Sequence, residues 1–399
     1  MTSSCLIIFV NLIYLSAHYP PHFESFPVEL AKNGARVWAV TDLRQEELSS
    51  RLRHHIQGHI QVDSLHNYGA VLDKCRRLAQ SVGEIHFVES NLESWLDLEA
   101  ILREDLGVPG LWPQQLQKFK HKSLMKQVFT QAGIPVALGI RPSCTEDVMS
   151  FVQQVGFPLI LKPDVGVGAQ KTYRLNSQLD LDPLAEKISA SGSWSTCFLE
   201  QHVLGTVESF DGFCDHGGNI VYYTTHTQSA GVREIVHDKL DFYIYSMISH
   251  PPDLIEAGFS TIKAFQVKAK FFHLEFFRTP DNRLVGLEIN LRPPGGRMLD
   301  MMNYGAEIDC YRAWASTLLN NRFPYAYEQK WHCMHISRRE NFRYRHQMTE
   351  ALNKFQDLIL THGELDPASA MAMGKEYVLA RSKNLKDLFS LQQFLQARF

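Results

Sequence analysis

The stretch that most constrains this chain covers residues 271–297 and reads FFHLEFFRTPDNRLVGLEINLRPPGGR. Two short runs of bulky apolar residues flank Thr279-Pro280-Asp281-Asn282. Proline at the second turn position, followed by Asp and Asn, is typical of a turn between two strands. The stretch therefore predicts a β-hairpin whose loop covers residues 280–283.

The register of this hairpin would bring polar groups together. A loop at residues 280–283 places Glu275 opposite Glu288 and His273 opposite Asn290, and side chains two positions apart share one face. Opposed carboxylates repel, with Cβ atoms about 5 Å apart, unless a cation lies between them. Hard oxygen ligands of this kind suit Mg²⁺ or Mn²⁺. The alternative is a half-exposed hairpin whose charged residues face water.

The residues after the hairpin favour a binding site. Arg292 follows two positions after Asn290, so a cation shares the face, and Pro293-Pro294-Gly295-Gly296 then ends the strand. Two carboxylates, an amide and a guanidinium on one patch are more than a solvated strand requires.

Composition bounds the class of protein. The chain has 399 residues, enough for two to four domains, and a net charge of -3 gives no support for a nucleic-acid or charged membrane partner. Its seven cysteines are scattered without a CxxC pair, as in reduced thiols of a cytoplasmic protein. The apolar run 5–15 is shorter than the about 20 residues that cross a bilayer. We expect a buried first strand there, with a signal anchor as the minor alternative.

The first third of the chain alternates strands and helices. A strand at 5–15, a helix at 22–33 ended by Gly34, and a strand at 37–40 form a βαβ unit, which predicts a parallel sheet. No GxGxxG follows the first strand, which argues against a dinucleotide site. The Pro- and Gly-rich stretch 107–113 is the first domain boundary.

Beyond that boundary we expect a mixture of helices and antiparallel strands. The predicted helices cover 115–131, 146–155 and 253–265, and the predicted strands cover 136–141, 158–163, 196–200, 207–214 and 220–227. From about residue 331 onwards the chain carries a basic cluster, which is usually a solvated face, and a helix at 385–397. We assign no function to that part.

Two segments could contact a nucleotide. Lys162 closes an apolar strand and precedes a loop with Gly166 and Gly168, where backbone N–H groups could approach phosphates. The spacing is not that of a Walker loop, and GxG alone more often marks an ordinary turn. The run 198–203 could present backbone groups to an adenine, and Glu208 could accept from ribose hydroxyls. A strand edge with surface acids is an equally good reading of that run.

The order of these pieces resembles a known family. Lys122 in FKHKSLMKQVFTQAGIP, Lys162 with its loop, the run 200–203, and then Glu275 and Glu288-x-Asn290-x-Arg292 resemble the successive elements of the ATP-grasp superfamily. Within it the chain is similar to the biotin-carboxylase-like carboxylate-amine ligases, which include the L-amino acid ligases. The resemblance extends to about Ala315.

The resemblance implies a fold that is partly α/β and partly α+β. A Rossmann-like pre-ATP-grasp domain would cover 1–113 and an ATP-grasp domain 114–330. The latter would combine an antiparallel-sheet core with a lid at about 136–195. A small C-terminal α+β region would cover 331–399.

The resemblance also implies roles for single residues. Lys122 and Lys162 would contact ATP phosphates beneath a loop with Gly166 and Gly168, which Lys171 could supplement. The adenine hinge would be Glu200, Gln201 and Val203, with Glu208 on the ribose. Mg²⁺ or Mn²⁺ would be held by Glu275, Glu288 and Asn290, and Arg292 would face the reacting carboxylate or acyl phosphate.

Substrate groups are harder to assign. Arg233 or Arg297 could bind a substrate carboxylate, and His226 could act as an acid or base, although a salt bridge and a packed histidine are the commoner roles. We expect an ATP-dependent ligase that joins a small-molecule carboxylate to an amine through an acyl phosphate, with a homodimer left open. The alternatives are a biotin-carboxylase-like enzyme that activates bicarbonate and a non-catalytic ATP-binding regulator.

Overall fold

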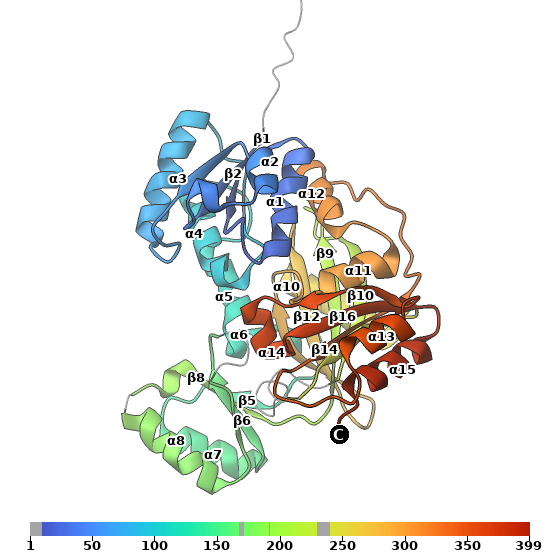
Figure 1. Cartoon of the computed structure of the whole chain (residues 1–399). Coiled ribbons are helices and arrows are strands. Elements are labelled where there is room, and N and C mark those ends of the chain that lie inside the picture. Colours follow the sequence, from blue (N-terminus) through green and yellow to red (C-terminus); the bar gives the residue numbers. More distant parts are fainter. Residues whose placement is uncertain (1–9, 167–170, 191, 230–239) are drawn as a thin grey trace, which may run out of the picture.

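The computed structural model describes residues 10–166, 171–190, 192–229 and 240–399 (Figure 1). At the top of the view lies a four-stranded parallel sheet with the order β3-β2-β1-β4. Its strands are β1 (Val10–Leu15), β2 (Ala35–Thr41), β3 (Gly58–Gln61) and β4 (Phe87–Glu89). The parallel sheet predicted from the βαβ pattern is therefore confirmed.

Both faces of this sheet are buried, as parallel sheets require. Leu12 and Tyr14 of β1 face a core shared with helices α1 (Ser25–Lys32) and α12 (Cys310–Asn320). Ile13 and Leu15 face a second core beneath α3 (Tyr68–Val82) and α4 (Leu96–Leu106). The predicted helix 22–33 begins as the 3-10 turn η1 (Pro21–Glu24), and α2 (Ser50–His55) precedes β3.

The centre of the molecule is an eight-stranded antiparallel sheet with the order β13-β12-β9-β10-β11-β14-β16-β15. Its strands are β9 (Thr206–Cys214), β10 (Ile220–Gln228), β11 (Tyr243–Ser246), β12 (Phe271–Arg278), β13 (Leu284–Asn290), β14 (His332–Arg338), β15 (Ile359–Glu364) and β16 (Glu376–Ser382). The last three come from the region expected to be a separate C-terminal unit, and they extend the same sheet.

Helices from the second half of the chain pack on this sheet and beside it. They are α10 (Pro252–Phe265), α11 (Met298–Ala306), α13 (Met348–Lys354), α14 (Pro367–Met373) and α15 (Leu385–Gln396). No helix in the described parts of the chain is long and apolar enough to cross a membrane.

A smaller four-stranded sheet forms the lobe at the lower left of Figure 1. Its order is β5-β8-β6-β7, and it carries helices α7 (Thr145–Val155) and α8 (Gln178–Ala190). The strands are β5 (Gly139–Ile140), β6 (Leu159–Pro163), β7 (Tyr173–Leu175) and β8 (Cys197–Gln201). Because the lobe has its own apolar core, it is a compact unit. It spans residues 139–201, and the lid is predicted at about 136–195.

One predicted helix is divided in two. The stretch 115–131 forms α5 (Pro113–Lys120) and α6 (Lys122–Gln131), with His121 between them in an extended conformation. His121 makes a β-bridge with Val165, and the Asp164 carboxylate accepts from the Ser123 amide at 2.8 Å. This contact satisfies an amide at the start of α6 and places Lys122 in its first turn.

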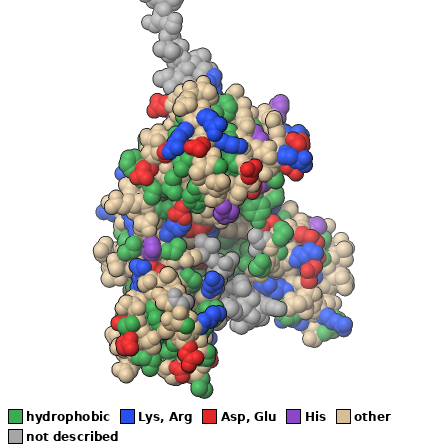
Figure 2. All heavy atoms as spheres, turned by 90° about the vertical axis from the view of Figure 1, so that its left-hand side faces the viewer, with side chains coloured by type: hydrophobic (Ala, Val, Ile, Leu, Met, Phe, Trp, Pro, Cys, Tyr) green, Lys and Arg blue, Asp and Glu red, His purple; other side chains and the backbone are tan. Residues whose placement is uncertain are grey.

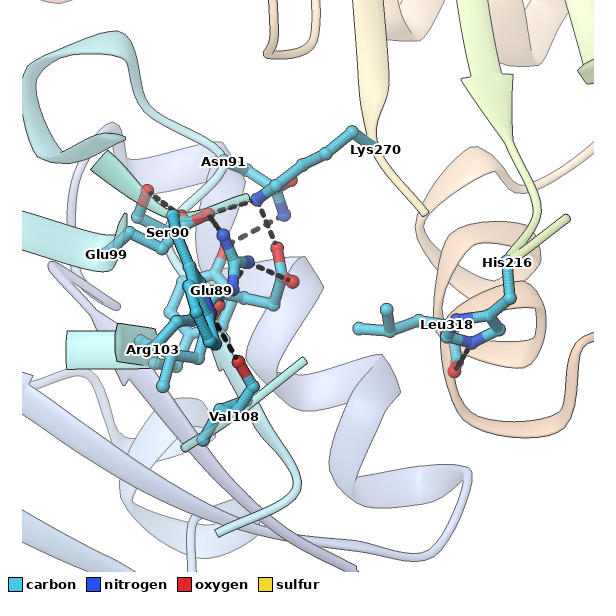
Figure 3. Close-up of polar contacts among 12 residues, drawn as sticks. Glu89, Ser90, Asn91, Glu99, Arg103, Val108, His216, Lys270 and Leu318 are labelled. Atoms are coloured by element: carbon cyan, nitrogen blue, oxygen red, sulfur yellow. Dashed lines mark hydrogen bonds and ion pairs between the residues drawn. The ribbon is translucent and has the colours of Figure 1, made fainter. Parts of the chain in front are cut away.

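A buried cluster of four charges joins the N-terminal sheet to the central sheet (Figure 3). Lys270, just before β12, lies 2.7 Å from Glu89 at the end of β4 and also contacts Glu99 of α4. Arg103 of α4 lies 2.8 Å from Glu89 and 2.7 Å from Glu99. All four side chains are at most 4% exposed, and the two carboxylates match the two cations.

Candidate active site

The hairpin pairs Glu275 and His273 as predicted from its sequence, although the ladder beside the turn is offset by one residue, with Arg278 opposite Leu284. In β12 and β13, Glu275 lies opposite Glu288 and His273 lies opposite Asn290. The turn closes with a hydrogen bond from the Thr279 amide to the Arg283 carbonyl at 3.0 Å. A β-bulge between Glu275 and Phe276 interrupts the ladder directly beside the pair of carboxylates.

Of the two opposed carboxylates, Glu275 is buried and Glu288 is partly exposed. Burial raises the pKa of Glu275 to about 7, and the Glu288 carboxylate adds to that rise. Gln228 donates to Glu275 at 2.8 Å and Asn290 donates to Glu288 at 3.2 Å. A divalent cation would relieve this repulsion.

The residues present fit Mg²⁺ of the kind that is shared with a nucleotide. The described residues contain no cluster of three or more His, Cys, Asp or Glu side chains that would cage a metal by themselves. Mg²⁺ commonly takes one or two carboxylates and completes its shell with phosphates and water. Glu275 and Glu288 supply that number.

These carboxylates lie in a cavity of about 710 Å³ between the small lobe and the central sheet. Figure 2 shows the molecular surface hollowed between the body that carries the N-terminal sheet and the lower lobes. Nine predicted site residues line the cavity: Lys122, Lys162, Gly166, Glu200, Gln201, Val203, Glu275, Glu288 and Arg292. Gly168 and Arg233 lie outside the described residues.

Lysine side chains gather at one part of the cavity wall. Lys122 donates to the Gly166 carbonyl at 2.9 Å, and Lys162 of β6 forms an ion pair with Glu200 of β8. Lys126 of α6 lies 3.5 Å from the same carboxylate and donates to the Gly286 carbonyl at 2.8 Å. Sequence reasoning missed Lys126, although it follows Lys122 by one helical turn and shares its face.

Glu200 has a different environment from the one expected at an adenine hinge. Burial favours its protonated form, but the Lys126 and Lys162 ammonium groups outweigh burial and hold the pKa of Glu200 below its ordinary value. The Glu200 carboxylate is therefore engaged in ion pairs with Lys126 and Lys162. Any contact of this residue with an adenine would have to come from its backbone.

The part of the cavity beside Glu200 has apolar walls from both sheets. Ile160 of the small sheet, Val203 after it, and Phe277 and Leu287 of the hairpin line it. Apolar faces on two sides with a few polar groups between them are the usual setting for a flat ring. That Val203 belongs to an adenine hinge remains a prediction.

Four predicted residues do not line the cavity. Glu208 is bound by Arg278 at 2.8 Å, which leaves its predicted ribose contact without support in this arrangement. Asn290 lies behind Glu288, to which it donates. Arg297 forms an ion pair with Asp300 at 2.8 Å and also lies off the cavity wall.

His226 is a fourth such residue, and it belongs to a buried polar chain. It is 1% exposed, and its Nδ1 lies 2.7 Å from the Asp211 carboxylate, which also accepts from Nδ1 of His273. His273 is the member of this chain that lines the cavity. The two histidines oppose burial and hold the pKa of Asp211 well below its ordinary value.

Arg292 lies beside the carboxylates at the end of the hairpin. Its guanidinium donates to the Pro293 carbonyl at 2.9 Å and stands 3.6 Å from Glu93, which follows β4 of the N-terminal sheet. The part of the chain that carries the N-terminal sheet, through Glu93, thus helps to orient the Arg292 guanidinium, which lines the cavity.

Comparisons with known proteins find similarity in sequence and in fold. No family model matches the chain. A curated relative, the L-arginine-specific L-amino acid ligase of Bacillus subtilis, is 25% identical over 245 residues, and the match covers 59% of this chain and 58% of that relative. The chain thus matches less than two thirds of that relative's length.

Solved structures match over nearly the whole chain. An L-amino acid ligase from Bacillus licheniformis superposes with a TM-score of 0.73 at 12% identity, covering 96% of both chains. The N5-carboxyaminoimidazole synthetase of Staphylococcus aureus, complexed with ADP, gives 0.69 at 14% identity and covers 96% of this chain and 97% of that one. At this level of identity the agreement concerns the fold.

Proposed function

We propose that this chain, which has the ATP-grasp fold of the carboxylate-amine ligases, joins a small-molecule carboxylate to an amine at the cost of ATP. The observation that carries this proposal is the single cavity in which lysines, two opposed carboxylates and an arginine meet. Each of these groups can neutralise or position the anions that meet when a phosphoryl group is transferred to a carboxylate.

The reaction begins with two anions that repel. A substrate carboxylate attacks the γ-phosphorus of ATP, and ADP leaves, so charge must be neutralised and the groups held in line. Lys122 and Lys162 would bind phosphate oxygens, and Arg292 would hold the attacking carboxylate. Mg²⁺ held by Glu275 and Glu288 would neutralise charge on the phosphates when bound.

The second half of the reaction forms the C–N bond. The amine attacks the carbonyl carbon of the acyl phosphate, phosphate leaves, and the nitrogen loses a proton. Water must be kept out meanwhile, because it would hydrolyse the acyl phosphate. We propose that the lobe built on β5 to β8 closes over the cavity for that purpose, since it is a compact unit with its own core.

An amine acceptor suits the comparisons better than bicarbonate activation does. The curated match is to an L-amino acid ligase, and a biotin carboxylase from Campylobacter jejuni superposes with a TM-score of 0.65, against 0.73 for the L-amino acid ligase.

The six described cysteines are all free, which suits a reducing compartment, and we propose that the reaction takes place in the cytoplasm.

Release of ADP in the presence of amino acid pairs tests the proposal. Wild-type protein with ATP and Mg²⁺ or Mn²⁺ should release ADP only with productive pairs, and mass spectrometry should find the condensed product. Glu288→Gln should abolish this turnover, because it removes one of the two carboxylates. Glu256→Gln, the same change at an exposed position of α10, should leave it intact. ADP release that no pair stimulates would refute the proposal.

A further inference from the structure

The cavity has a second end, beyond Arg292, whose wall comes from the C-terminal part of the chain. Ser369, Ala372 and Met373 of α14 line it together with Phe242, Ile244 and Met298. None of these six side chains carries a charge. Because polar and charged groups of the reacting centre lie next to it, this uncharged wall forms a distinct subsite.

The wall belongs to a packed apolar cluster. Phe242 is 4%, Ile244 0% and Met298 5% exposed, and Met373 packs against them. Ile244 belongs to strand β11, Phe242 directly precedes that strand, and Met298 begins helix α11, which contacts β14 of the same sheet. These three side chains therefore support the wall from behind, and the surface that a substrate can touch comes mainly from the partly exposed residues of α14.

Helix α14 is anchored at its C-terminal end. Arg339 donates to the Ala372 carbonyl at 2.6 Å, and the Ser337 hydroxyl donates to the Met373 carbonyl. The Gly374 amide closes the helix on the Ala370 carbonyl at 2.9 Å. These contacts satisfy carbonyls at the helix end and fix where the Met373 side chain begins.

Met373 lies directly against the turn that follows Arg292. A Cβ added to Gly296 would stand 2.7 Å from its Sδ and 2.8 Å from its Cε, so the thioether touches the Gly296 backbone. Gly296 also has a φ of +59°, a conformation that favours glycine. Arg292 and Met373 line the same cavity, so a substrate whose carboxylate is held by Arg292 would extend along that cavity towards Met373.

We propose that Met373 and its neighbours bind the side chain of the acid that is activated, and that this acid is an amino acid with an uncharged, largely apolar side chain. The inference rests on the proposed function and assigns a substrate class to that same site. Methionine is flexible and polarisable, so this wall suits leucine, methionine or phenylalanine side chains better than one fixed shape. A basic side chain would bring its charge next to this uncharged wall without a charged partner, which is unfavourable.

Substrate profiles of Met373 variants test this inference. With one amine fixed in excess, kcat/KM of wild-type protein is measured for leucine, methionine, phenylalanine, arginine and glutamate as the acid. Met373→Ala should lower kcat/KM for leucine and methionine about 10-fold or more, since several buried methylene contacts are lost. Met373→Phe should favour small acids. Met371→Ala, the same change at a position that is 74% exposed on the same helix, should alter nothing.

The outcomes separate the two proposals. If no pair of substrates raises ADP release in wild-type protein, the proposed function fails. If ADP release occurs but arginine or glutamate is the preferred acid, or if folded Met373→Ala and Met373→Phe keep the wild-type profile for the acid, the subsite assignment fails alone. A melting temperature for each variant confirms that it is folded, and a profile that changes for the amine only also overturns the assignment.

Discussion

Replacing Lys270 by Met tests whether the buried charge cluster of Figure 3 holds the two bodies together. Lys270 contacts both Glu89 and Glu99, and all of these side chains are at most 3% exposed. Its loss leaves two buried carboxylates with Arg103 as the remaining cation. Removing one partner of a buried ion pair costs about 3–5 kcal/mol, and we expect a loss of that size in the free energy of unfolding.

Urea unfolding at two pH values measures this loss. In the variant Arg103 is the remaining cation, and Glu89 loses Lys270, the main cation that opposes its burial. Burial already raises the pKa of Glu89, so its pKa in the folded state rises further above the value of about 4.3 in the unfolded state. The folded variant then binds more protons than the unfolded chain, and its stability increases as the pH falls. The deficit relative to wild type should be smaller at pH 5 than at pH 8.

The matched control is Lys268→Met, which makes the same change at an exposed position two residues earlier. It should change the free energy of unfolding by no more than about 0.5 kcal/mol. The reasoning is refuted if Lys270→Met is as stable as this control, or if its deficit is the same at both pH values. Separate unfolding of the two bodies in Lys270→Met would show directly that the cluster couples them.

Two further substitutions probe the lysine end of the cavity. Lys126→Met should lower the free energy of unfolding by about 1.5–3 kcal/mol, because Glu200 loses a charged partner and the Gly286 carbonyl loses its donor; an unchanged urea midpoint would contradict this. Asp164→Ala should cost about 0.5–2 kcal/mol, because it removes the acceptor for the Ser123 amide, and it should also raise KM for ATP by displacing Lys122. Unaltered stability and KM would show that the start of α6 does not depend on Asp164.

The hairpin was predictable because its determinants are local. A loop at 280–283 and the period of two along a strand predict the pair of Glu275 and Glu288. The ladder beside the turn is offset by one residue from that prediction, and the bulge after Glu275 restores the pair. Glu275 and Glu288 could therefore be paired from the sequence alone, as could the parallel N-terminal sheet from its βαβ pattern.

The features that sequence reasoning missed depend on distant residues. The break at His121 depends on a carboxylate 43 positions later, and nothing near His121 signals it. The pairing of Glu200 with Lys126 and Lys162 likewise joins three separate elements. In such cases tertiary contacts decide between alternatives that local propensity leaves open.

The wall supplied by α14 was missed for a similar reason. Its sequence, PASAMAM, is short and has no amphipathic period, so it gives no sign that Met373 lines a cavity. The strands that flank this helix, β15 and β16, reveal its position only when they are seen to extend the central sheet.

The way the C-terminal strands extend the central sheet has a consequence for biosynthesis. The groups assigned to ATP and its metal come from residues 122–290, so they leave the ribosome before α14 and β16 do. During synthesis the nucleotide end of the cavity can therefore form while the α14 part of the wall for the acid is still missing. A nascent chain could bind ATP without yet retaining an acid to activate, and the last strands to pair would bring the two capacities together.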